Sequence, residues 1–265
     1  MGVIRTDRLL DEFFFAPEKI CAQISKTSLQ QGKGLYSFLV EKGMYKPNVL
    51  TRETFLFLKE ARTWEFVAEL FKKYQKLWSG PDSSIYVFPS RYSIFDPYLH
   101  KNGFTIFPDK IFLFLPRLED EKEIEALFVH EYHHATRMDK TKKKLDAYTL
   151  QDSLIMEGLA EMAVAEYVGA EYVASWHKRY SEQVLIATWE KYFKDHLELP
   201  LTDPGHDRLL YGYRTGKPMV GYALGYYLIK LYKKIDRNFS IPGTFTTPAA
   251  TIVMAVQERM LKALN

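Results

Sequence analysis

Two histidines and a glutamate near the middle of the chain have the types and spacing for metal-dependent chemistry. His130, Glu131 and His134 spell H-E-x-x-H within the stretch ALFVHEYHHATR. Residues four apart on a helix lie on one face, one turn apart, so the two imidazoles can hold one metal ion between them. Glu131 lies about 100° round the helix from His130, close enough to act on a water bound to that ion. The pattern predicts a zinc hydrolase, with a peptidase as the first choice.

A catalytic zinc site usually has three protein ligands, so one more donor is needed. Glu157, in the sequence MEGLAE, is the best candidate, with 22 residues between it and His134. It belongs to the next predicted helix, and Gly158 beside it would let the two helices approach closely. Glu161, one turn further on, is placed to accept the second ring N–H of His130 or His134. The alternative for both glutamates is a solvated position on the helix.

His133 is the competing metal ligand in this stretch. It lies three residues from His130, on the same side of a helix. A pair of histidines four residues apart with a glutamate between them is the better-attested zinc geometry. We therefore expect His130 and His134, and not His133, to bind the metal.

The elements around these residues predict a mainly helical α+β fold. Three short strands bounded by Pro, Gly and Asp residues should form a small sheet packed beside the H-E-x-x-H helix, and a helical C-terminal part follows. The predicted strands cover residues 85–88, 104–107 and 111–115. The predicted helices cover residues 7–30, 51–78, 119–135, 152–169, 172–196, 217–235 and 247–264, with 136–150 and 197–216 as connections. We expect a helical N-terminal region at 1–80 and a zincin-like domain at 81–265, or one continuous domain.

The predicted H-E-x-x-H helix buries the face that carries its glutamate. Ile124, Leu127, Phe128 and Ala135 mark the apolar side, and Glu131 falls near the middle of it. An unpaired charge placed there would be costly, and a bound metal ion would resolve that cost. This placement favours a metal site over a chance match to a short pattern.

Composition excludes several classes of protein. The chain has 265 residues, 47% of them hydrophobic and 26% charged, with a net charge of +3, so nucleic acid is not an expected partner. Cys21 is the single cysteine, which rules out intrachain disulfides and fits a reducing compartment. We expect no membrane span, because no run of about 18 apolar residues occurs, and no signal peptide, hence a cytoplasmic protein.

The motifs HEYHH, IMEGLAE and GYALGY together resemble the YjaZ-like family of predicted bacterial zinc-dependent proteases, over roughly residues 84–235. More broadly, the chain resembles the gluzincin-type metallopeptidases. The resemblance implies that Glu157 is the third zinc ligand, because in that group a glutamate from the helix after H-E-x-x-H takes this place.

The resemblance also bears on the group that stabilises the oxyanion. Related peptidases often carry Tyr-x-x-Gly on a later helix, and Tyr222 to Gly225 fits that pattern. A phenol is a neutral hydrogen-bond donor at pH 7 and can stabilise charge that develops in the transition state. The alternative is a tyrosine of the core. Competing residues for the oxyanion role are Tyr226, His206, Arg208 and Tyr213, although His206, like His177 and His196, is expected to be a surface or loop residue.

The predicted activity is hydrolysis of peptide bonds in a peptide or protein substrate. Zn²⁺ held by His130, His134 and Glu157 would activate a water, Glu131 would act as general base, and Tyr222 would bind the oxyanion. By analogy, strand 104–107 or 111–115 would offer an edge to an extended peptide. Two alternatives stay open: a zinc hydrolase of a non-peptide amide or ester, and a catalytically silent zincin-fold protein that binds or regulates.

Overall fold

The chain folds into two compact units. A computed structural model describes residues 2–26, 28–91, 102–106 and 108–262. The units are Met1–Ala135 and Thr136–Asn265, and the division between them falls inside one helix, α6 (Glu121–Thr141). The fold is mainly helical with one small sheet, so the predicted α+β class is confirmed. The predicted domain border between residues 80 and 81 lies within the first unit and stays a prediction.

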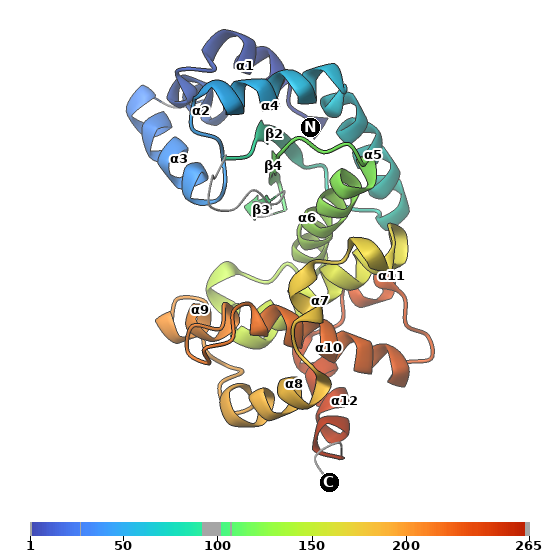
Figure 1. The fold of residues 1–265 in the computed structure, drawn as a ribbon. Helices are drawn as coiled ribbons and strands as arrows, with labels where there is room; N and C mark the ends of the chain where they lie inside the picture. Colours follow the sequence, from blue (N-terminus) through green and yellow to red (C-terminus); the bar gives the residue numbers. More distant parts are fainter. Residues whose placement is uncertain (1, 27, 92–101, 107, 263–265) are drawn as a thin grey trace. The chain divides into compact units, whose positions relative to one another are not determined.

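The first unit contains a four-stranded mixed sheet with the order β1-β2-β4-β3 (Figure 1). Its strands are β1 (Gly2–Val3), β2 (Ser84–Pro89), β3 (Asn102–Ile106) and β4 (Lys110–Leu115). β2 pairs in parallel with β1 and β4, whereas β3 runs antiparallel to β4. The prediction counted three strands, because two residues are too few to show the alternation that marks β1 as a strand. Phe107, the last residue of the predicted strand 104–107, lies outside the described residues.

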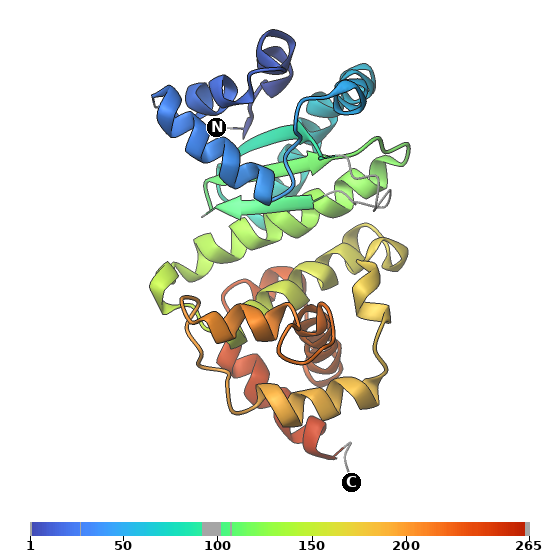
Figure 2. The same cartoon turned by 60° about the vertical axis from the view of Figure 1, so that its left-hand side comes forward.

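Helices cover both faces of this sheet (Figure 2). The side chains of neighbouring strand residues point to opposite faces, and β3 shows the result. Phe104 packs edge-on against Phe38 of α3 (Leu29–Glu41) with ring centroids 5.5 Å apart, while Thr105 hydrogen-bonds to Glu131 of α6. The other helices of this unit are α1 (Thr6–Phe13), α2 (Pro17–Ser25), α3 (Leu29–Glu41), α4 (Val49–Glu60) and α5 (Thr63–Trp78).

Two of the predicted N-terminal helices are each interrupted. The segment 7–30 contains α1, α2 and the start of α3, and Pro17 opens α2 at a position where its missing N–H costs nothing. The segment 51–78 breaks at Arg62, whose backbone is left-handed with φ of 55°. Apolar spacing continues across both breaks, so the pattern alone did not reveal them.

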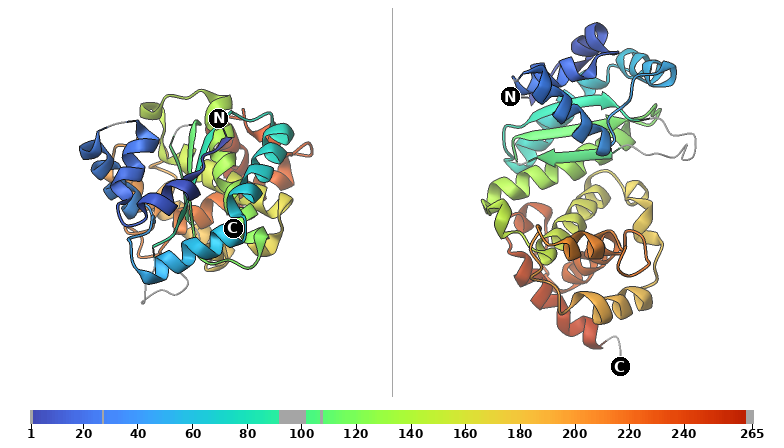
Figure 3. Two further views of the ribbon diagram at one scale, coloured as in Figure 1. Left: turned by 90° about the horizontal axis from the view of Figure 1, so that it is seen from above. Right: turned by 90° about the vertical axis from the view of Figure 1, so that its left-hand side faces the viewer.

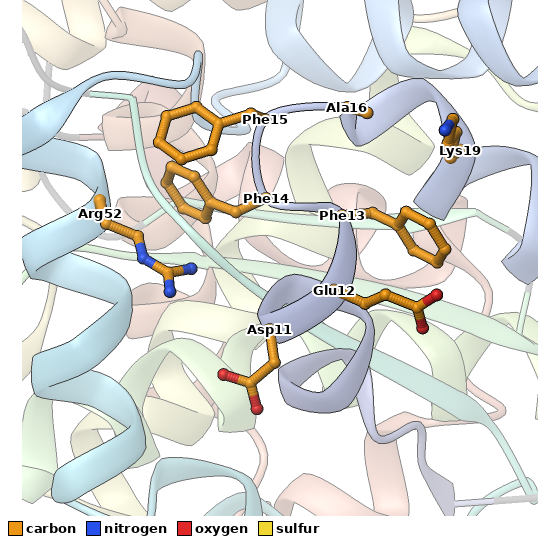
Figure 4. Close-up of a pocket in the computed structure, with 8 residues that line it drawn as sticks. All are labelled: Asp11, Glu12, Phe13, Phe14, Phe15, Ala16, Lys19 and Arg52. Carbon is orange, nitrogen blue, oxygen red and sulfur yellow. The ribbon is translucent and has the colours of Figure 1, made fainter.

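An open hollow of about 320 Å³ lies on the first unit where α1 connects to α2 (Figure 4). Arg52 of α4 reaches into this region and lies over the rings of Phe14 and Phe55, each 5.1 Å away. Its guanidinium also donates to the Leu10 carbonyl at 3.4 Å. These contacts hold the α1–α2 connection against α4. The lining residues are Asp11, Glu12, Phe13, Phe14, Phe15, Ala16, Lys19 and Arg52.

The second unit is helical, and α7 (Leu150–Tyr167) and α10 (Val220–Ile235) pack together at its centre (Figure 3). α7 is apolar on almost every side and mostly buried, as expected for a helix enclosed by others. At Gly158 an added Cβ would lie less than 3.0 Å from the Gly225 carbonyl of α10. The prediction gave Gly158 a close approach to the H-E-x-x-H helix, but the atoms nearest to an added Cβ belong to α10 instead. The helices are α7 (Leu150–Tyr167), α8 (Glu182–Thr188), α9 (Pro204–Leu210), α10 (Val220–Ile235), α11 (Ile241–Thr244) and α12 (Ala249–Lys262).

Several predicted boundaries in this unit were wrong. α7 starts after Thr149, where Asp152 completes a capping box, rather than at Asp152. The predicted helix 172–196 is a series of short helical turns followed by α8, and the predicted connection 197–216 contains α9. α6 continues to Thr141 into the predicted polar connection. Across the described ranges, no helix has both the length and the apolarity needed to cross a membrane.

Candidate metal centre and active site

The two histidines of H-E-x-x-H face each other across one turn of α6. His130 Nε2 and His134 Nε2 are 3.0 Å apart, and their ring planes are inclined at 84°. Both imidazoles therefore present the same ring nitrogen toward one point. This is the arrangement that the four-residue spacing predicts, and it suits two ligands of one ion.

Glu157 of α7 completes a group of three possible ligands. His130, His134 and Glu157 could together hold a metal ion. Imidazole nitrogens and carboxylate oxygens are ligands that zinc binds at about 2.0–2.2 Å. Two imidazoles with one carboxylate is also a known catalytic donor set for zinc.

Glu131 is buried beside the sheet, with an exposed fraction of 5%. The Thr105 hydroxyl donates to its Oε2 at 2.7 Å and also lies 3.1 Å from its backbone oxygen. Gly103, two residues back on β3, leaves room for the carboxylate: an added Cβ would lie 2.5 Å from Oε1. The predicted strand 104–107 contained Thr105, but nothing in the sequence indicated that its hydroxyl meets Glu131. Gly103 was missed because the predicted strand started at Phe104, whereas β3 starts at Asn102.

The side chains between the two histidines anchor α6 in the core. His133 is completely buried and packs edge-on against Trp78, with ring centroids 6.1 Å apart. Tyr132 stacks on the same indole at 5.9 Å, and its hydroxyl donates to the Pro81 carbonyl. These contacts fix the rotation of α6 about its axis, and therefore the direction in which the H-E-x-x-H side chains point.

Glu161 is also buried, with an exposed fraction of 5%. Its Oε2 accepts the backbone N–H of Ala174 at 2.9 Å, which holds the segment before the 3-10 turn Ser175–Lys178 on α7. Burial raises the pKa of the Tyr226 phenol, and the negative charge of Glu161 raises it further. The role predicted for Glu161, as acceptor for a zinc-bound histidine, stays a prediction.

Tyr222 lies in a cluster of aromatic residues in the second unit. Its ring meets Trp176 edge-on at 5.2 Å and lies 5.8 Å from the ring of Tyr211, to which its side chain hydrogen-bonds. Burial raises the pKa of Tyr211; the hydrogen bond with Tyr222 opposes this, while the charge of Glu157 adds to it. Both phenols therefore belong to the surroundings of Glu157. Tyr211 was missed because it lies outside the Tyr-x-x-Gly pattern.

The prediction that His206 is a surface or loop residue was wrong. It lies on α9 with an exposed fraction of 1%. Its Nε2 is 2.9 Å from the Ser153 hydroxyl of α7, and its Nδ1 is 2.9 Å from the Asp207 carboxylate. The ring thus joins α9 to α7 one turn before Glu157. The competing Tyr213 is 78% exposed.

A small sheet lies beside the H-E-x-x-H helix, and His130, His134 and Glu157 are the residues that could hold a metal ion. The chain belongs to the family described as Predicted Zn-dependent protease (DUF2268), which matches residues 63–254. It is 32% identical over 227 residues to "Uncharacterized protein YjaZ" of Bacillus subtilis (strain 168), across 84% of this chain and 86% of that protein. No solved structure matches the chain. The predicted family is confirmed.

Proposed function

We propose that this protein is a zinc-dependent metallopeptidase. One observation carries the proposal: His130 and His134 present their Nε2 atoms 3.0 Å apart, Glu157 is a residue that could complete a metal site with them, and the carboxylate of Glu131, next to His130 in the sequence, is buried. Membership of a family of predicted zinc-dependent proteases supports it. The donor set, two imidazole nitrogens and a carboxylate oxygen, favours zinc and leaves a fourth position for water or substrate.

Glu131 is the proposed general base. When bound, zinc would supply a Lewis acid that polarises the scissile carbonyl and promotes ionisation of the attacking water. The Glu131 carboxylate accepts a proton from that water and returns it to the leaving amine. Its burial keeps bulk water from competing for the carboxylate, and the Thr105 hydroxyl of β3 fixes the position of one of its oxygens.

Tyr222 is the proposed donor to the oxyanion. A neutral phenol gives its hydrogen bond to the negative charge that forms on the carbonyl oxygen, and the bond strengthens as that charge develops. The hydrogen bond between Tyr222 and Tyr211 gives the phenol a defined orientation. Trp176 packs against the Tyr222 ring from another direction and limits its movement.

The free edge of β3 is the proposed binding site for the peptide backbone. β4 is paired on both sides, by β2 and β3, whereas β3 ends the sheet formed by the described residues. Of the two strands considered from sequence, β3 is therefore the one with an edge to offer. A peptide added there would lie along the strand that carries Thr105, the residue in contact with Glu131.

The experiment compares the wild-type chain with Glu131→Gln after loading with zinc. Zinc is measured by plasma mass spectrometry, and hydrolysis is measured on a randomised fluorescence-quenched peptide library. We expect both proteins to bind about one zinc per chain. We expect only the wild type to cleave peptides, because the amide of glutamine cannot accept the proton.

Three outcomes would contradict the peptidase. Cleavage of small amides or esters without cleavage of peptides would favour the non-peptide hydrolase. Stoichiometric zinc without any hydrolysis would favour a binding or regulatory protein. Failure of zinc to bind, with no change in thermal stability on its addition, would exclude a zinc enzyme altogether.

A further inference from the structure

The carboxylate of Glu131 is held differently at its two oxygens. Oε2 accepts the Thr105 hydroxyl at 2.7 Å. Oε1 faces Gly103, where an added Cβ would lie 2.5 Å away. Both partners come from the same face of β3, because residues two apart on a strand point the same way. One edge strand therefore sets the position of the whole carboxylate.

We propose that Thr105 and Gly103 give the two oxygens of Glu131 separate roles, Oε2 being held and Oε1 being left to move the proton. This proposal rests on the proposed peptidase activity, in which Glu131 is the general base. Thr105 is then a positioning residue that acts through Glu131, and Gly103 provides the space that Oε1 occupies.

The hydroxyl is suited to this role by its hydrogen-bonding capacity. A threonine hydroxyl has one proton to donate and lies 2.7 Å from Oε2 against 3.1 Å from the Glu131 backbone oxygen. The shorter contact has the length of a charge-assisted bond to a carboxylate. Because Oε2 accepts the Thr105 hydroxyl, Oε1 is the oxygen that transfers the proton. One proton passes from the attacking water to Oε1 and then to the leaving amine, so Glu131 ends the cycle ionised.

Glycine at position 103 is required by the same geometry. The three atoms nearest to an added Cβ are all in the Glu131 side chain: Cγ, Oε1 at 2.5 Å and Cδ at 2.6 Å. These atoms belong to the movable end of a side chain, so Gly103→Ala would fold by pushing the carboxylate aside. The substitution should therefore change activity far more than stability.

The experiment uses the zinc-loaded protein, residues 1–265, and four variants. Thr105→Val removes the hydroxyl but keeps the shape, and Thr105→Ser restores the hydroxyl. Gly103→Ala tests the space at Oε1, and Gly34→Ala is its control, because an added Cβ at Gly34 meets nothing within 4 Å. Kinetics are measured on the best peptide from the quenched library, and crystal structures of each variant show the orientation of Glu131.

For Thr105→Val and Gly103→Ala we expect kcat to fall about 10- to 100-fold, with KM and zinc content nearly unchanged. Thr105→Ser and Gly34→Ala should keep wild-type kcat. The crystal structures should show Glu131 displaced or in more than one orientation in the two impaired variants. Unchanged kcat together with an unmoved Glu131 in Thr105→Val would overturn the proposal.

The crystallographic measurement separates this proposal from the proposed function. If the wild type cleaves no peptide, the peptidase is wrong, and the orientation of Glu131 in Thr105→Val still decides whether the hydroxyl positions it. If the wild type is active, and Thr105→Val keeps both full activity and the wild-type orientation of Glu131, only the role proposed for Thr105 is wrong.

Discussion

Gly158 of α7 and Gly225 of α10 meet backbone to backbone. An added Cβ at Gly158 would come within 3.0 Å of the Gly225 carbonyl, and one at Gly225 would meet the Leu154 carbonyl equally closely. Gly158 follows Glu157, and Gly225 closes the Tyr-x-x-Gly that begins at Tyr222. The crossing of these two helices therefore sets the distance between a proposed ligand and the proposed oxyanion donor.

Alanine at either glycine should destabilise the protein. The obstructing atoms belong to backbone, so the helices must separate, and overpacking of this kind costs about 1–3 kcal/mol. Urea unfolding of Gly158→Ala and Gly225→Ala, compared with Gly34→Ala, measures the difference. Equal stability of all three variants would show that α7 and α10 are not in backbone contact.

His134→Ala should abolish stoichiometric zinc binding. His134 offers one of the two imidazole nitrogens that lie 3.0 Å apart, and two remaining donors are too few for a stable site. His177→Ala provides the control, since that ring packs against Tyr226. Equilibrium dialysis followed by metal analysis gives the zinc content. Retention of one zinc by His134→Ala would remove His134 from the ligand set.

Glu157→Gln should weaken zinc binding without unfolding the chain. The amide keeps the shape of the side chain but removes the negative charge that an ion would attract. Glu166→Gln is a matched control on the same helix, because Glu166 pairs with Lys233 at 2.8 Å. Competition with a fluorescent zinc chelator measures affinity. Equal zinc affinity in Glu157→Gln and Glu166→Gln would show that a residue other than Glu157 is the third ligand.

Tyr222→Phe should lower kcat by about 100-fold or more while KM changes little, as for other single donors to an oxyanion. Tyr213→Phe is the control, because Tyr213 is 78% exposed. Tyr211→Phe should give an intermediate loss, since Tyr211 orients the other phenol through their hydrogen bond. If Tyr211→Phe lowered kcat more than Tyr222→Phe, Tyr211 would be the oxyanion donor and Tyr222 the residue that orients it.

Cys21 should be unreactive in the folded protein. Burial raises the pKa of its thiol to about 12, and its side chain is completely enclosed. Because the folded pKa lies above the unfolded value of about 8.5, the stability linked to this thiol is present below that pH and is lost as pH rises toward 12. Tyr36, whose pKa burial also raises to about 12, acts in the same direction.

Two measurements check this prediction. Iodoacetamide should label Cys21 at pH 8 only as fast as the chain unfolds, with urea-unfolded protein as the control. Thermal unfolding midpoints should decline above about pH 9. Rapid labelling of folded protein would show that the thiol is accessible.

The sequence was sufficient for the parts of the site that lie within one element. The spacing of His130 and His134 fixes their relation on any helix, and the apolar neighbours of Glu131 predict its burial. The family followed from three short motifs and is confirmed. These predictions needed no knowledge of how distant segments pack.

Contacts between different helices and strands could not be predicted from the sequence in this way. Thr105 gains its role from the register of β3 beside α6, and Tyr211 from the packing of α9 on α7. His206 looks like any loop histidine until α9 buries it against Ser153. Helix breaks at left-handed residues such as Arg62 also escape periodicity, because the apolar spacing continues across them.

α6 belongs to both compact units. His134 lies just before the division and Arg137 just after it, and the Arg137 guanidinium donates to the Thr244 and Thr247 carbonyls. A fragment that stops at residue 135 would turn the H-E-x-x-H segment into a fraying helix end, because its last carbonyls would lose their N–H partners. The division between the two compact units is therefore not a place where the chain could be cut with the H-E-x-x-H turn left intact.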